Sequence, residues 1–333
     1  MPRPRRLWPL CAVFFLAGCG GRFPQSTLAP HSDFGRAIDR LFTDIFWWAA
    51  LVFAVVETLL LVAIVRFRHR PGRAAPRPTH GHTLLEIAWT IAPAVILVFV
   101  AVPTVRTIFV TAGTAPPDAL KVEVVGHQWW WEYRYPELGI VTADEMHVPL
   151  GRPVQVAITS ADVIHSFWAP MLGGKRDAIP GHVNRIAFRA DSAGEYWGQC
   201  AEFCGASHAN MRLRVFVDSG PAFETWVRDQ RAAPAPPAPG SAAEQGRTVF
   251  ARSACIGCHT VQGVSAGVIG PNLTHVGSRR TIAGGMFPND SAHLAQWIAD
   301  APALKPGSIM TRMKPPLTDA DIAALVAYLQ SLQ

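Results

Sequence analysis

Charged side chains are scarce in this sequence. Asp, Glu, Lys and Arg make up only 16% of the 333 residues, whereas apolar residues make up 50%. This balance excludes an ordinary soluble protein and indicates membrane-spanning segments. The length is sufficient for two or three domains.

Cysteines are also few, and their positions are informative. There are six, at positions 11, 19, 200, 204, 255 and 258, and the last four form two close pairs. Each pair has His or Met beside it at a spacing typical of metal or haem ligands. We therefore predict metal and haem chemistry. The alternative is a pair of disulfides in an exported protein.

The N-terminal apolar run is too short to cross a bilayer. A basic stretch precedes apolar residues 7–18, which is the pattern of a secretory signal, so we predict a signal peptide over residues 1–18. The run ends Leu-Ala-Gly-Cys at 16–19, which resembles the bacterial lipoprotein cleavage box and implies a lipid-modified Cys19. The alternatives are a plain signal peptide or an uncleaved tail.

Two later segments, 45–65 and about 87–108, have the length and apolar character of membrane helices. We predict that residues 19–110 contain a two-helix transmembrane hairpin. The loop at 66–82 carries five Arg and no acid, which places it in the cytoplasm and everything after about residue 109 on the outer side. Glu57 within the first span is either a functional acid or a helix-packing residue, and Glu86 begins the second span.

Residues 111–230 have the pattern of short strands. Segments 121–125, 154–158 and 212–217 alternate apolar and polar side chains, and Gly and Pro separate them. This pattern predicts a β-sandwich or barrel.

One loop in this region concentrates soft metal ligands. Cys200, Cys204, His208 and Met211 lie within twelve residues, and thiolates with imidazole favour copper or zinc. Two thiolates can bridge two copper ions, and we expect the second histidine to be His165, in a loop after a strand. A structural zinc site is the alternative, but thioethers such as that of Met211 are poor zinc ligands.

Residues 35–230 resemble subunit II of the haem-copper cytochrome c oxidases. The resemblance rests on these sequences: Gly-His-Gln-Trp-Trp-Trp at 126–131, Asp-Val-Ile-His-Ser-Phe at 162–167, Lys-Arg-Asp-Ala-Ile-Pro-Gly at 175–181, Cys-Ala-Glu-Phe-Cys-Gly at 200–205, and Glu-Ile-Ala-Trp at 86–89 followed by Pro93. It implies a cupredoxin-like domain whose binuclear CuA centre is held by His165, Cys200, Cys204, His208, Met211 and the backbone carbonyl of Glu202.

The resemblance implies three further roles. The Glu202 side chain would bind a magnesium ion shared with the catalytic subunit. Trp129 would be the electron entrance to CuA, with the neighbouring tryptophans in packing roles. Glu86 would lie at the mouth of a proton path.

The C-terminal part reads as a separate haem domain. A Pro/Ala-rich linker over residues 231–243 would tether it without fixing it. In residues 244–333, Cys255, Cys258 and His259 form the c-type haem attachment pattern, with two thioethers and one iron ligand. This region resembles a class I cytochrome c. Met310 fits the Pro-Gly spacing of the second iron ligand, and Met313 is the alternate.

Together these features predict a multidomain chain: a two-helix transmembrane hairpin, an all-β cupredoxin-like sandwich and an all-α cytochrome c domain. The resemblance implies an electron-transfer subunit of a proton-pumping terminal oxidase in the bacterial inner membrane, with both metal domains on the periplasmic side. The implied partners are catalytic subunit I, further membrane subunits, membrane lipid, and cytochrome c or another soluble donor, with no nucleic acid.

Two alternative functions stay open. The chain could be the electron-entrance subunit of a CuA-type nitric oxide reductase, or a stand-alone membrane-anchored redox or copper carrier. The quinol-oxidase relative of subunit II lacks the copper ligands, so their presence here argues against it.

Overall fold

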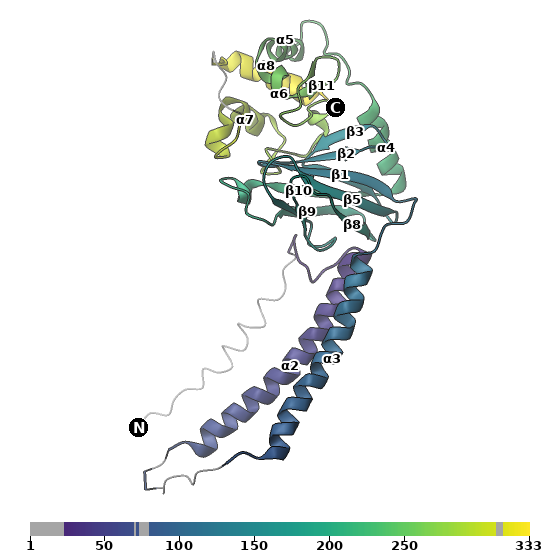
Figure 1. Ribbon diagram of the computed structural model, residues 1–333. Coiled ribbons are helices and arrows are strands. Elements are labelled where there is room, and N and C mark those ends of the chain that lie inside the picture. The colour runs from purple at the N-terminus through teal and green to yellow at the C-terminus, as the bar shows by residue number, and fades with distance from the viewer. Residues whose placement is uncertain (1–22, 70, 73–79, 311–315) are drawn as a thin grey trace, which may run out of the picture.

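The computed structural model describes residues 23–69, 71–72, 80–310 and 316–333. The predicted signal peptide, Cys19 and Met313 lie outside these residues. The described chain forms a helical hairpin, a β-sandwich at one end of the hairpin, and a mostly helical domain on the far side of the sandwich (Figure 1).

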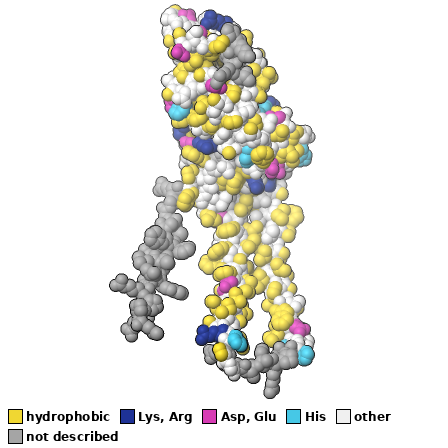
Figure 2. Space-filling view, turned by 90° about the vertical axis from the view of Figure 1, so that its left-hand side faces the viewer, with side chains coloured by type: hydrophobic (Ala, Val, Ile, Leu, Met, Phe, Trp, Pro, Cys, Tyr) yellow, Lys and Arg dark blue, Asp and Glu magenta, His cyan; other side chains and the backbone are white. Residues whose placement is uncertain are grey.

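The hairpin consists of α2 (Asp33–Phe67) and α3 (Thr83–Thr111), which lie side by side (Figure 1). Both are long and apolar enough to cross a membrane. Their surface is almost entirely hydrophobic in Figure 2, with basic side chains gathered near the end remote from the sandwich. Both helices exceed the predicted spans, and each begins at a side-chain cap: Ser32 accepts a hydrogen bond from the Gly35 N–H, and His82 from the Leu85 N–H.

Two five-stranded sheets form the sandwich. The first has the order β3-β2-β1-β5-β8 and the second β4-β10-β9-β6-β7. Their strands are β1 (Leu120–His127), β2 (Trp130–Tyr135), β3 (Ile140–Ala143), β4 (Glu145–Pro149), β5 (Pro153–Ser160), β6 (His165–Trp168), β7 (Arg176–Ala178), β8 (Asn184–Arg189), β9 (Gly194–Cys200) and β10 (Arg212–Asp218). The β1–β5 and β4–β10 pairs are parallel, and the other pairs are antiparallel.

Alternation of side chains explains how the sheets face each other. In β5, every second residue is buried, and β1 begins with the same alternation. The buried faces of both sheets form one core, which includes Val124, Trp131, Ile158 and Leu213. The predicted sandwich is therefore confirmed, and the three predicted strands correspond to β1, β5 and β10.

The C-terminal domain has its own hydrophobic core. After α4 (Gly220–Arg231), it contains α5 (Ala242–Arg252), α6 (Cys255–Cys258), α7 (Ser291–Leu304) and α8 (Asp319–Ser331), with 3₁₀ turn η2 (Val276–Ser278) and short ladders of β11 (Thr260–Val261) with β12 (Ser265–Ala266) and β13 (Thr281–Ile282) with β14 (Phe287–Pro288).

Helices α5 and α8 cross closely at a glycine. Gly246 of α5 lies against the backbone of Ala324 in α8, where no side chain would fit. Thr318 caps α8, as predicted from the sequence, and forms a capping box with Asp321.

Two local expectations differ from the structure. His165 is the first residue of β6 rather than a loop residue, because it pairs with Ala178 of β7 while Phe167 pairs with Cys200 of β9. The linker is confined between the end of α4 and the start of α5. It does not leave the C-terminal domain free, because hydrogen bonds such as that from Thr281 N–H to the Glu145 carboxylate hold that domain against the sandwich.

Candidate metal and haem centres

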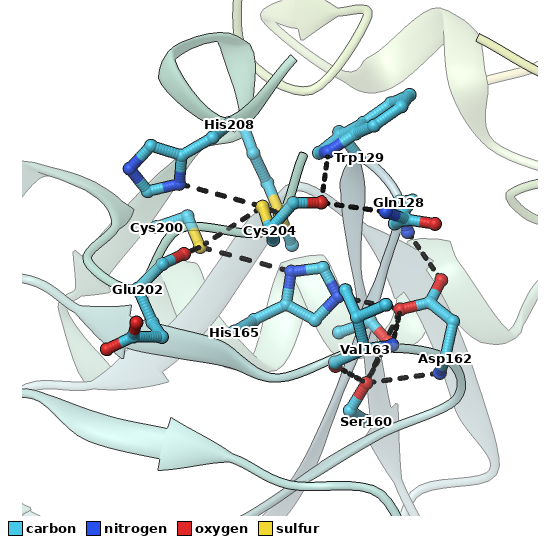
Figure 3. Close-up of polar contacts among 12 residues, drawn as sticks. Gln128, Trp129, Ser160, Asp162, Val163, His165, Cys200, Glu202, Cys204 and His208 are labelled. Atoms are coloured by element: carbon cyan, nitrogen blue, oxygen red, sulfur yellow. Dashed lines mark hydrogen bonds and ion pairs between the residues drawn. The ribbon is translucent and has the colours of Figure 1, made fainter. Parts of the chain in front are cut away.

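Two thiols, two imidazoles and a thioether converge at one end of the sandwich (Figure 3). The Sγ atoms of Cys200 and Cys204 are 3.8 Å apart. His165 Nδ1 lies 3.9 Å from Cys200 Sγ, and His208 Nδ1 lies 3.6 Å from Cys204 Sγ. Met211 Sδ is 3.9 Å from Cys204 Sγ. The structure thus brings together all five side chains predicted to bind copper.

The backbone positions these ligands from three segments. Cys200 ends β9, His165 begins β6, and Met211 follows η1 (His208–Asn210) directly before β10. A hydrogen bond from Cys200 N–H to the Met211 carbonyl closes the ligand loop at 2.9 Å. The Glu202 carbonyl oxygen lies 3.2 Å from Cys200 Sγ, while the exposed Glu202 carboxylate points away from the cluster (Figure 3).

Asp162 orients His165. Its Oδ1 lies 2.7 Å from His165 Nε2, which leaves Nδ1 facing the thiols. Burial lowers the pKa of His165, but hydrogen bonds with Cys200 and Asp162 outweigh burial and raise this pKa above its usual value. Burial raises the pKa of Asp162, but hydrogen bonds from His165 and two backbone N–H groups lower it overall.

The two neighbouring thiols have pKa values shifted in opposite directions. The hydrogen bond between them lowers the pKa of Cys200 and raises that of Cys204, and burial acts against the charged form of both. One thiolate therefore forms readily, which favours binding of a soft cation. All four described cysteines have free thiols in this structure. This donor set of sulfur and imidazole fits copper.

A second site is a largely apolar cavity between the C-terminal domain and the sandwich, with about 1000 Å³ of empty space including its open mouth. Four of the predicted haem-binding residues line it: Cys255, Cys258, His259 and Met310. An apolar cavity with two thiols, an imidazole and a thioether on its walls fits a c-type haem.

His259 is prepared to act as a neutral ligand. Its Nδ1 is 2.8 Å from the carbonyl oxygen of Pro271, so Nε2 is left for the cavity. Gly270 lies against the imidazole, where a Cβ would overlap the ring. Burial lowers the pKa of His259, and the hydrogen bond with Pro271 only partly offsets this effect.

Trp129 touches both sites. Its Nε1–H donates to the Cys204 carbonyl at 3.0 Å, and the side chain also lines the cavity. Gln128 Nε2 donates to the same carbonyl at 2.7 Å. The next two tryptophans differ: Trp130 stacks on His127, whereas Trp131 is buried in the core against His165 and Phe167.

Sequence reasoning missed the buried charges between the two domains. Lys305, which follows α7, donates to the carbonyl of Trp129, and Glu145 accepts hydrogen bonds from the N–H groups of Arg280 and Thr281. Asp144 is also buried and accepts from the Trp131 N–H. None of the three belongs to a ligand motif, and their spacing in the sequence gave no signal that they would meet.

Glu86 and Glu57 lie far from these centres. Glu86 is in the first turn of α3, at the end of the hairpin remote from the sandwich, and Glu57 is within α2 (Figure 1). The structure therefore does not bring either acid to the metal or haem site.

Three family models match successive parts of the chain. Residues 28–107 match the transmembrane domain of cytochrome c oxidase subunit II, residues 139–217 match its periplasmic domain, and residues 243–333 match cytochrome c. The order agrees with the hairpin, the sandwich and the helical domain. The cytochrome c match implies a haem, and the subunit II match implies CuA copper.

Relatives match almost the whole chain. Cytochrome c oxidase subunit 2 of Alkalihalophilus pseudofirmus is 37% identical, covering 98% of this chain and 99% of the relative. The Bacillus subtilis protein of the same name is 34% identical, covering 96% and 94%. Quinol oxidase subunit 2 of Bacillus anthracis is 30% identical and covers only 68% of this chain and 80% of the relative. The three family models in succession and this near full-length similarity show that the chain belongs to the cytochrome c oxidase subunit II family, in the form that carries a cytochrome c domain.

Proposed function

We propose that this chain relays electrons from a soluble donor to the catalytic subunit of a terminal oxidase, with the haem domain first and the copper site second. The single observation that carries the order is the position of Trp129. Its indole lines the haem cavity and donates a hydrogen bond to the backbone of Cys204. Trp129 is only 8% exposed because the haem domain covers it. A soluble donor would therefore deliver electrons to the haem domain.

The geometry supports the ligands that we propose for each group. His165, Cys200, Cys204, His208, Met211 and the carbonyl of Glu202 would hold the copper pair. Cys255 and Cys258 would form the haem thioethers, with His259 and Met310 on the iron. When bound, both groups supply one-electron redox chemistry at nearly fixed positions. The protein holds the ligands, excludes water by burial of the cluster, and provides a packed contact between the two sites.

The remaining roles concern partners. The exposed Glu202 carboxylate points away from the copper ligands, which supports a magnesium site shared with subunit I. Glu86, at the remote end of the hairpin, is proposed to lie at a proton path on the cytoplasmic side. The Arg-rich loop supports an orientation with that end on the cytoplasmic side of a bacterial inner membrane and both redox domains in the periplasm. Oxygen reduction and proton pumping would take place in the catalytic subunit.

Reciprocal substitutions test the two-site relay in the purified full-length protein. Cys204→Ser should abolish the mixed-valence electron paramagnetic resonance signal of two coppers and leave the c-type haem band. Cys255→Ser should weaken covalent haem attachment and leave the copper signal. Zinc or a single copper per chain in the wild type, or loss of both signals in Cys204→Ser, would contradict the proposal.

A further inference from the structure

Lys305 is a buried cation at the contact between the two domains. Its side chain is 3% exposed, and Nζ donates to the carbonyl oxygen of Trp129 at 2.6 Å and to that of Ala283 at 2.7 Å. The first carbonyl belongs to the sandwich and the second to the haem domain. One ammonium group therefore joins the two domains at the tryptophan that touches both sites.

The carboxylate of Asp144, in the sandwich, compensates the buried charge of Lys305. Asp144 is buried between β3 and β4, lines the same cavity, and attracts Lys305 electrostatically. Its carboxylate is held by the N–H of Trp131 at 2.9 Å. Burial lowers the pKa of Lys305 to about 8, so its ammonium group is charged at neutral pH. A buried cation is tolerated when its donors are hydrogen-bonded and an opposite charge acts on it, and both conditions hold for Lys305.

The two residues after Lys305 hold the same region. The Pro306 carbonyl accepts a hydrogen bond from Ser207 Oγ at 2.7 Å, and Ser207 directly precedes the copper-ligand candidate His208. Gly307 lies against the indole of Trp129, where a Cβ would overlap the ring. Segment 305–307 thus contacts the backbone of Trp129, its indole and the copper-ligand loop. The same segment leads to Met310 on the cavity wall.

We propose that Lys305 is a positioning residue that holds the haem domain against the sandwich with Trp129 between the two sites. This inference rests on the proposed relay, because that function gives the docked arrangement its purpose. Removing the buried ammonium group leaves the carbonyl oxygens of Trp129 and Ala283 without this donor, and unsatisfied buried acceptors weaken the contact. Removal of the Lys305 ammonium group should therefore loosen the haem domain while both ligand sets remain intact.

Docking is measured by hydrogen exchange in the full-length protein in detergent, comparing wild type with Lys305→Met. The reporters are the amides of Arg212, which donates to Gly284 across the contact, and Thr281, which donates to Glu145. Their exchange should accelerate at least tenfold, or about 1.4 kcal/mol of local opening free energy. Lys121→Met is the matched control, because Lys121 is exposed and pairs with Glu137 within the sandwich. Wild-type exchange at both reporters in Lys305→Met would overturn the proposal.

Electron transfer provides an independent readout. After photochemical reduction of the haem, one electron should pass from haem to copper in the wild type, so that the haem is reoxidised as copper is reduced. Absence of this step in the wild type would refute the relay itself. In Lys305→Met the step should slow about tenfold with unchanged haem and copper potentials. If electron transfer slows, the redox potentials shift and hydrogen exchange stays normal, then Lys305 sets the redox potentials and does not hold the domains together.

A second variant guards against misfolding of Lys305→Met. Asp144→Asn removes the compensating charge but keeps an oxygen that can accept from the Trp131 N–H. It should accelerate exchange at the same two amides, by a smaller factor. If Lys305→Met fails to fold and hydrogen exchange in Asp144→Asn is unchanged, the proposed positioning role of Lys305 is overturned.

Discussion

At the scale of single residues, the carboxylate of Asp162 determines which nitrogen of His165 faces the thiols. Oδ1 of Asp162 contacts His165 Nε2, and Oδ2 accepts from the Gln128 N–H at 2.7 Å. The same side chain therefore orients an imidazole ligand and fixes the backbone that leads to Trp129. Carboxylate partners of metal-binding histidines set the tautomer and the ring orientation.

Asp162→Asn should weaken copper binding while preserving the fold. Loss of such a partner commonly lowers metal affinity about 10- to 100-fold. Copper affinity is measured by competition with a chelator of known strength. Asp118→Asn is the matched control, because Asp118 is exposed and precedes β1, whereas Gln128 and Trp129, near the copper ligands, follow the opposite end of that strand. Equal affinities in the two variants would show that Asp162 has no orienting role.

The sequence located the ligands at this scale but not their supports. Cys200, Cys204, His208 and Met211 are close in the chain, so their spacing alone predicted a shared site. Asp162 stands only three residues before His165, yet its role depends on ring orientation, which spacing does not determine. Among the three consecutive tryptophans, the strand pattern could not tell that Trp131 is buried while Trp129 reaches a second domain.

At the scale of secondary-structure elements, the start of α8 depends on a carboxylate. Asp321 accepts hydrogen bonds from Thr318 N–H and Oγ1, and from Arg252 of α5. The hydrogen bonds with Thr318 lower the pKa of Asp321 below its ordinary value of 3.8. A depressed carboxyl pKa stabilises the fold above the ordinary value, and this contribution is lost as the pH falls through the lower folded-state pKa.

Asp321→Asn should therefore destabilise the haem domain at neutral pH but not in strong acid. The thermal midpoint of that domain is measured at both pH values for the variant and the wild type. Asp319→Asn is the control, because Asp319 lies in the same helical turn outside the capping box. A loss of stability that is the same in both variants, or that persists in acid, would contradict the role of the box.

Regular elements were largely predictable, and exceptions have identifiable causes. Alternation predicted β1, β5 and β10, and Thr318 was recognisable as the cap of α8. The strand β6 was missed because it is four residues long and its pairing with β7 and β9 is non-local. Register between distant segments is what brings His165 to Cys200, and it is not encoded in local periodicity.

At the scale of the whole molecule, two hydrophobic cores meet through a polar contact. One core lies between the sheets and the other among α5, α7 and α8. The composition of the linker predicted a tether that would not fix the haem domain. It could not predict docking, because a Pro/Ala segment carries no information about the surfaces of the two domains. Glu145 belongs to the sandwich and Lys305 to the haem domain, and each forms a hydrogen bond with the backbone of the opposite domain. These contacts depend on how the folded domains dock, which local sequence does not determine.

Removal of copper should lower the thermal midpoints of the two domains by different amounts. A ligand at about 1,000 times its dissociation constant stabilises the folded state by about 4 kcal/mol, so chelating copper should lower the thermal midpoint of the sandwich by roughly 10–20 °C. In the wild type, the haem-domain midpoint should fall by a smaller amount, because the buried contact at Trp129 couples the domains. In Lys305→Met it should move less than in the wild type, since one of the groups that couple the domains is gone. Calorimetry of the full-length protein in detergent measures both transitions, and restoring copper is the control. A haem-domain midpoint insensitive to copper in the wild type would mean that the domains unfold independently despite the contact.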